Sequence, residues 1–195
     1  LNDLTPDQLD IVPLEVSEDG KSAKVYLFDV YGRGHAKFYQ EVWVPLKDGR
    51  IVPEVDGVKY SRLSVVQRYA EGQRHIVNGL FKGVSLDRGA VATFWPAPKP
   101  YFVIVGEDSA EMCHCVKQVD SHAGACIVTD GGVEKAALPL EIYGVMANMT
   151  VSELTAAASS IDAALEDLGN RNEGEPVVNK LLSLFISLHR FRLMH

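Results

Sequence analysis

The chain has 195 residues, of which 47% are hydrophobic and 23% are charged, and its formal net charge is -7 at pH 7. This balance is typical of a globular domain, because a disordered chain carries too little apolar surface to offset the entropy lost on folding. The acidic charge argues against nucleic acid as a partner, since nucleic-acid binding depends on clustered Lys and Arg, and the sequence has no basic run.

The number of cysteines and the hydropathy of the sequence indicate a cellular location. The three cysteines, Cys113, Cys115 and Cys126, are odd in number and too few for a disulfide framework, which predicts a reducing, cytoplasmic location. No apolar stretch approaches the roughly 18 residues that cross a bilayer. No signal-peptide pattern follows Leu1, so we expect no membrane partner.

The first fifty residues predict an N-terminal arm followed by a hairpin. Residues 1–20 are expected to be an arm or linker, in which Thr5-Pro6-Asp7 favours a turn or a helix start. Apolar and β-branched residues over 23–30 and 38–44 predict two strands. Asp48-Gly49 lies between apolar runs, which is a strong signal for a tight hairpin.

The middle of the chain is rich in strands. The apolar pattern predicts strands over residues 63–69, 75–81, 90–95, 101–105, 124–129 and 133–138. Asp130-Gly131-Gly132 predicts a hairpin between the last two of these strands. A helix is expected from Glu107 to about Val119, with acidic residues in its first turn.

A second helix is predicted over Thr150–Leu168. Thr150 and Glu153 form a capping-box pattern, and Gly169 suits a left-handed C-cap. Its apolar stripe consists of Leu154, Ala158, Ile161, Leu165 and Leu168. Pro176–Leu188 is an apolar segment that fits either a helix or a strand. We therefore expect an α+β domain over residues 21–195, with two to three helices packed against a mostly antiparallel or mixed β-sheet.

Several segments, taken in order, resemble one known family. They read VPLKDG at 44–49, LSVVQRY at 63–69, GLFKGVSLDRGAVA at 79–92 and LPLEIYGVM at 138–146. This order is similar to that of the C-terminal domain of the adenine deaminases, which belong to the amidohydrolase superfamily. The resemblance extends from about Leu4 to Leu188.

The resemblance implies a parent enzyme that hydrolyses adenine to hypoxanthine and ammonia at a pair of divalent metal ions, Mn or Fe. In the family those ions are held by a separate barrel domain. This sequence has six His and no His-x-His, so we expect no catalytic residue, no metal ligand and no cofactor in this chain. The barrel of the same enzyme is the expected partner, and the apolar strands also allow a homo-oligomer. The alternative is a standalone, non-catalytic ligand-binding or regulatory module.

One segment departs from the family. Where the family carries an Ala-His-Asp-Ser-His-Asn run, this chain has the residues from Pro96 to Tyr101, which read PAPKPY. Alanine and proline side chains cannot ligate a metal or transfer a proton. The family's polar residues therefore do not carry over to this loop.

Seven residues are candidates for contact with a substrate or with a domain interface. Four lie in the block of highest resemblance, and three lie in or beside the proline-rich loop; they are Arg68, Asn78, Lys82, Arg88, Trp95, Lys99 and Tyr101. The alternative for the first four is a solvated strand end, and for Trp95 it is a place in the core. A zinc site at the cysteines is disfavoured because Cys113 and Cys115 diverge by about 200° on a helix.

Overall fold

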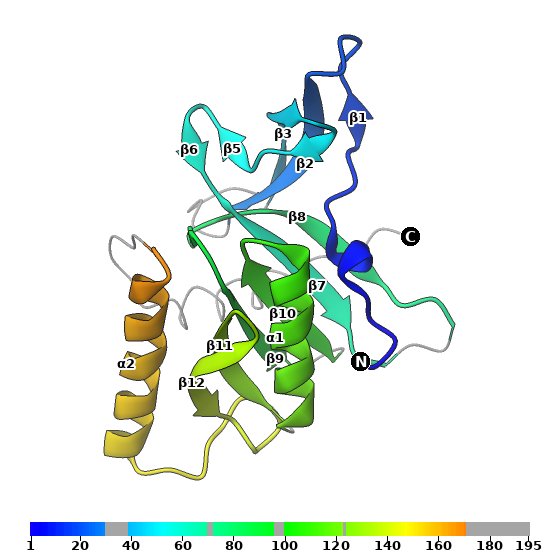
Figure 1. Ribbon diagram of the computed structural model, residues 1–195. Helices are drawn as coiled ribbons and strands as arrows, with labels where there is room; N and C mark the ends of the chain where they lie inside the picture. The colour runs from blue at the N-terminus through cyan, green and yellow to red at the C-terminus, as the bar shows by residue number, and fades with distance from the viewer. Residues whose placement is uncertain (30–38, 70–71, 96–99, 123, 171–195) are drawn as a thin grey trace.

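The computed structural model describes residues 1–29, 39–69, 72–95, 100–122 and 124–170. Within these ranges the chain forms a ten-stranded sheet, a separate two-stranded ribbon and two α-helices (Figure 1). The predicted α+β class is therefore confirmed, with both helices packed against the sheet. None of the helices in these ranges is long and apolar enough to span a membrane. The predicted segment Pro176–Leu188 lies outside the described residues.

The sheet is mixed, and its strand order does not follow the chain. Its ten strands are β1 Glu15–Val16, β2 Ser22–Asp29, β3 Tyr39–Lys47, β4 Arg50–Ile51, β7 Ser61–Gln67, β8 Ile76–Lys82, β9 Ala90–Trp95, β10 Tyr101–Gly106, β11 Ala125–Asp130 and β12 Val133–Pro139. Their order is β12-β11-β9-β10-β7-β8-β2-β3-β4, and β1 pairs with the first half of β2. Strands β2 and β8 pair in parallel, while the other pairings in this order are antiparallel. The separate ribbon joins β5 Glu54–Val55 to β6 Val58–Lys59.

Both predicted hairpins are present. Lys47 pairs with Arg50 across Asp48 and Gly49, whose φ angles are 51° and 73°. Asp130 pairs with Val133 across a pair of glycines that also have positive φ. Two consecutive residues with positive φ match the right-handed twist of the flanking strands, so each turn can join its strands directly.

Helix α1, Ser109–Ser121, covers one face of the sheet. Its N-cap is Asp108, whose Oδ1 accepts hydrogen bonds from the backbone N–H groups of Ala110 and Glu111 at 2.9 and 3.0 Å. Its apolar side packs on β9, β10 and β11. Leu4 and Leu9 of the N-terminal arm are fully buried in the same apolar cluster. The arm is thus part of this core, and a domain boundary at residue 20 stays a prediction.

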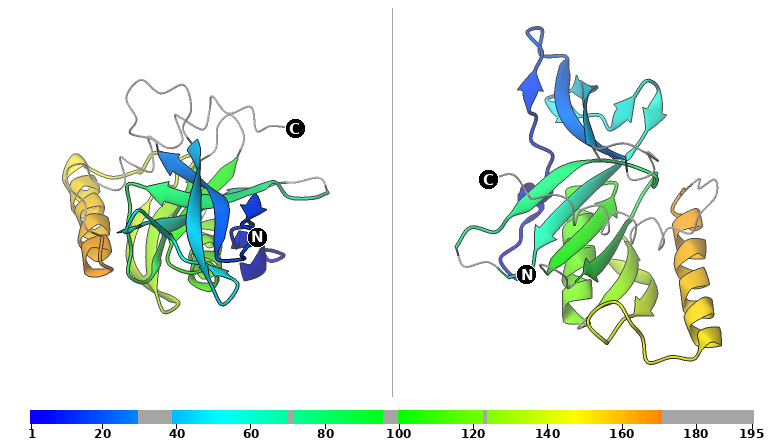
Figure 2. Two further views of the ribbon diagram at one scale, coloured as in Figure 1. Left: turned by 90° about the horizontal axis from the view of Figure 1, so that it is seen from above. Right: turned by 180° about the vertical axis from the view of Figure 1, so that it is seen from behind.

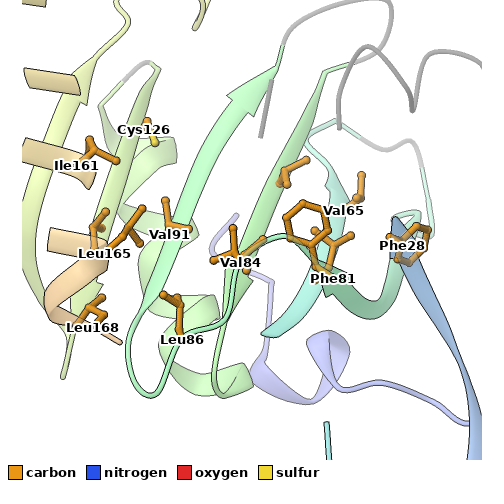
Figure 3. Packing of buried hydrophobic residues seen from close by; sticks show 14 of the residues in the cluster. Phe28, Val65, Phe81, Val84, Leu86, Val91, Cys126, Ile161, Leu165 and Leu168 are labelled. Atoms are coloured by element: carbon orange, nitrogen blue, oxygen red, sulfur yellow. The ribbon is translucent and has the colours of Figure 1, made fainter. Parts of the chain in front are cut away.

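Helix α2, Val151–Asp167, lies on the opposite face, against β12 and β11 (Figure 2). The predicted capping box is confirmed, since Thr150 and Glu153 each bond the other's backbone N–H. Ile161, Leu165 and Leu168 are fully buried and point toward the strands (Figure 3). The first member of the predicted apolar stripe, Leu154, is 40% exposed. Only the C-terminal half of the stripe belongs to the core.

Candidate functional site

Three of the predicted contact residues meet at one end of the sheet. Tyr101 begins β10 and is in register with Gln67 of β7 and with Trp95, the last residue of β9. Arg68 follows β7 directly, and its N–H donates to the carbonyl of Pro100 at 2.9 Å. We call this region the Arg68 end of the sheet. Lys99 lies outside the described residues, and of Trp95 only the backbone is described.

Arg68 is fixed among aromatic rings. The centre of its guanidinium lies 4.7, 5.1 and 5.7 Å from the ring centroids of Phe94, Tyr69 and Phe102. One guanidinium nitrogen is 3.1 Å from Asp120 Oδ1, near the end of α1. The Arg68 side chain is only 22% exposed, so solvent screens these contacts incompletely. The ion pair between Arg68 and Asp120 therefore joins α1 to the sheet.

A second arginine, not predicted from the sequence, braces the same end. One terminal nitrogen of Arg74 donates to the carbonyls of Gln67 and Arg68, both at 2.6 Å. Its other terminal nitrogen donates to both carboxylate oxygens of Asp3 at 2.9 and 3.0 Å. These hydrogen bonds lower the pKa of Asp3. The arm and the connection from β7 to β8 are thereby tied together.

The connection between β12 and α2 also reaches this end. Gly144 packs so closely on Phe94 that an added Cβ would lie 2.5 Å from the ring. Its neighbour Tyr143 has a φ of 56°, in the left-handed region that bulky residues rarely adopt, and is 76% exposed. Backbone strain of this kind persists only where surrounding packing enforces it, and it is common at functional sites.

Sequence reasoning did not single out Tyr143. The available signal was a group of large apolar residues, Ile142, Tyr143 and Met146, in a segment that fits neither helical nor strand periodicity. A group of such residues in a loop between a strand and a helix is typical of burial or of contact with a partner. In the structure all three are exposed.

Lys82 and Arg88 lie at the opposite end of the sheet. Arg88 precedes β9, whose six residues separate it from the Arg68 end by roughly 17 Å. Its guanidinium bonds Asp130 at 3.1 Å and Asp167 at 2.7 Å, which joins the end of α2 to β11. Lys82 Nζ donates to Asp29 Oδ2 at 2.9 Å, and this hydrogen bond raises the pKa of Lys82. Their role as ligand or interface contacts stays a prediction.

The contacts of Asn78 and Tyr101 are mainly with other parts of the same domain. The Asn78 amide donates to the carbonyls of Gln8 and Asp10 at 2.9 and 3.0 Å and accepts from the Ser64 hydroxyl at 2.7 Å. It therefore fastens the N-terminal arm to β8. Partial burial raises the pKa of the Tyr101 phenol, so this group stays neutral near pH 7.

The three thiols are buried in the core. Cys113 Sγ is 3.4 Å from the carbonyl of Leu4, whereas Cys115 Sγ is 3.4 Å from that of Ile127. Burial raises the pKa of Cys126 to about 12 and also raises that of Cys115, which keeps both thiols protonated. Across the described ranges, no three His, Cys, Asp or Glu side chains are grouped closely enough to hold a metal ion.

The sequence of the chain is similar to those of one family of known proteins. The family model for the adenine deaminase C-terminal domain matches residues 38–189. Among curated relatives, the adenine deaminase of Kosmotoga olearia is 28% identical over 156 residues, which are 80% of this chain and 26% of that protein. The adenine deaminase of Oceanobacillus iheyensis is 35% identical over 105 residues, covering 54% of this chain and 18% of that protein.

A third relative is matched over a similar fraction of its own length. The adenine deaminase of Moorella thermoacetica is 29% identical over 143 residues, which are 73% of this chain and 24% of that protein. The chain thus spans about a quarter or less of the length of these relatives. Since the family model matches most of the chain and includes both helices, the chain belongs to the family of adenine deaminase C-terminal domains.

Proposed function

We propose that this chain is the non-catalytic C-terminal part of an adenine-deaminase-like hydrolase of the amidohydrolase class. The reaction of the whole enzyme would be the hydrolysis of adenine to hypoxanthine and ammonia in the cytoplasm. One observation carries the proposal: the chain matches the C-terminal domain while spanning only 26% of the relative from Kosmotoga olearia. The remainder of such a protein, a metal-binding barrel, then has to supply the active site.

A pair of divalent metal ions, Mn or Fe, would activate the attacking water in that barrel. The donor set of the described residues does not suit such a pair. Hard divalent ions need converging carboxylate or imidazole ligands, and the described residues gather no three of them. The buried thiols of Cys115 and Cys126 are protonated and surrounded by apolar groups. We therefore derive no catalytic step through a metal bound to this chain.

The contribution of the chain is then positional. Its Arg68 end is stiffened by the guanidinium of Arg68, by the hydrogen bonds of Arg74 and by the close contact of Gly144 with Phe94. A rigid surface of this kind can hold a covering element over a neighbouring active site. Misplacing such an element by about 1 Å can cost on the order of a hundredfold in rate.

The test compares the 195-residue chain with the full product of its gene. Purified chain is incubated with adenine and Mn²⁺, and both hypoxanthine and ammonia are measured. We expect no turnover from the chain and turnover from a longer product that carries the barrel. Measurable deamination by the chain alone would contradict the proposal. A reading frame that encodes no metal-binding barrel upstream of Leu1 would instead favour a standalone binding or regulatory module.

A further inference from the structure

A set of exposed apolar residues extends along the chain from the loop after β12 to the first turns of α2. Its members are Ile142 (41% exposed), Tyr143 (76%), Met146 (53%), Val151 (81%) and Leu154 (40%). We call this surface the β12–α2 face. Single exposed apolar residues are ordinary, but five within thirteen positions of one chain segment mark an interaction surface.

The loop part of the β12–α2 face is held in one conformation. The backbones of Ile142 and Met146 bond each other at 2.9 and 3.1 Å, and Gly144 is packed against Phe94. The N–H of Leu140 donates to the carbonyl of Gly124 at 3.0 Å. A surface already fixed in its binding geometry loses little entropy on association. The strained φ of Tyr143 is the conformational cost of directing its ring outward.

The helical part of the face continues a stripe that is otherwise buried. Ile161 and Leu165 are fully buried against the sheet, whereas Leu154, two turns earlier on the same stripe, is half exposed. An apolar stripe that extends beyond its covering strands favours a second covering surface. Helix α2 begins at Val151, eight positions after Tyr143, so one partner can cover both parts.

The charged residues near the β12–α2 face indicate which kind of partner fits it. Between Leu140 and Leu154 the charged residues are Glu141 and Glu153, and both are exposed carboxylates. Two copies docked through this face would bring four like charges into one symmetric interface, which disfavours self-association. A partner with an apolar centre and a rim of Lys or Arg fits better. The relatives place about three quarters of their length outside this domain, and that length can supply such a surface.

We propose that the β12–α2 face docks on the catalytic part of the same polypeptide, with Tyr143 as its central contact. This inference rests on the proposed function, in which that catalytic part exists. Tyrosine at the centre of an interface commonly contributes a large share of the binding free energy, because its ring buries a large area at a small entropic cost.

Hydrogen exchange in the full-length gene product tests this docking. The amides of residues 140–154 are compared between the full-length protein and the 195-residue chain, and we expect at least about tenfold slower exchange in the full-length protein. The test variant is Tyr143→Asn, because Asn tolerates the left-handed region and leaves the loop able to fold. In the full-length protein it should reverse most of the added protection, while the midpoint of thermal unfolding of the short chain stays equal or rises.

The matched control is Val133→Thr, at the start of β12 and at the opposite end of that strand from the loop. Val133 is also exposed, at 59%, so its substitution should leave exchange over residues 140–154 unchanged. Equal exchange in both proteins would overturn the docking proposal while leaving deaminase activity, and so the proposed function, intact. A concentration-dependent dimer of the short chain that Tyr143→Asn dissociates would also overturn it, because the face would then bind a second copy.

Discussion

Substitution of Gly144 by Ala tests whether the β12–α2 loop is seated on the sheet as the structure has it. Gly144 has a φ of 71°, and an added Cβ would lie 2.5 Å from Phe94 Cδ1. A left-handed alanine costs about 1–2 kcal/mol, and overpacking adds about 1–3 kcal/mol. The lower entropy of the unfolded alanine chain returns about 0.4–1 kcal/mol. We expect Gly144→Ala to lower the free energy of unfolding by about 3 kcal/mol.

Phe94 cannot easily relieve this contact. Its ring packs 5.1 Å from that of Phe102, and the guanidinium of Arg68 lies against it. The control is Gly131→Ala, since Gly131 has a φ of 60° and an added Cβ there meets nothing within 4 Å. It should cost only about 1 kcal/mol, from backbone conformation alone. Urea unfolding of both variants at pH 7 measures the difference, and equal losses would show that the loop does not press on Phe94.

Two further predictions concern Arg68 and the cap of α2. Arg68→Met keeps the side-chain stem but removes its charge, and we expect it to lower the free energy of unfolding by about 1–2 kcal/mol. Arg88→Met should lower it by under about 1 kcal/mol, because the ion pairs of Arg88 are more exposed. Similar losses in both variants, measured by urea unfolding, would contradict the role given to the aromatic rings. Hydrogen bonds from the Thr150 backbone and hydroxyl lower the pKa of Glu153 below 4.5, so its stabilising effect is present above pH 4.5 and is lost as the pH falls through the folded-state pKa. Thermal unfolding of Glu153→Gln should therefore converge with that of the original chain in acid, and parallel curves would refute this.

Local signals predicted most elements because each depends on neighbouring residues. The capping box at Thr150 and the hairpins at Asp48 and Asp130 need no distant partner, and all three are present in the structure. Strand order could not be predicted in this way. The parallel pairing of β2 with β8 and the position of β9 between β10 and β11 depend on contacts between distant segments. The same limit applies to Asn78, whose bonds to the N-terminal arm join residues about 70 positions apart.

The candidate residues lie at two opposite ends of the sheet, and the positions of the strand ends explain this separation. Arg68 and Tyr101 flank strands that terminate together, so their proximity follows from antiparallel pairing once β7, β9 and β10 are known to be neighbours. Lys82 and Arg88 belong to the same block of sequence, but they lie at the opposite end of the sheet, where β8 ends and β9 begins. Nearness in sequence therefore grouped residues that the fold separates.

Tyr143 represents a different case, because its local signal is a group of large apolar residues in a loop and does not indicate its backbone conformation. Residue preference argues against a left-handed tyrosine, so a reading of the sequence assigns the special conformation to the following glycine alone. The conformation arises because Gly144 approaches both Phe94 and Gly124, and an added Cβ would be 2.8 Å from the Gly144 Cα when placed on Gly124. Phe94 and Gly124, which are distant in sequence from this loop, thus constrain the backbone at Tyr143. This backbone conformation directs the Tyr143 ring into solvent. If the ring had no partner, its replacement by glycine would relieve strain at no functional cost, so the exposed strain itself is the reason to look for a docking surface there.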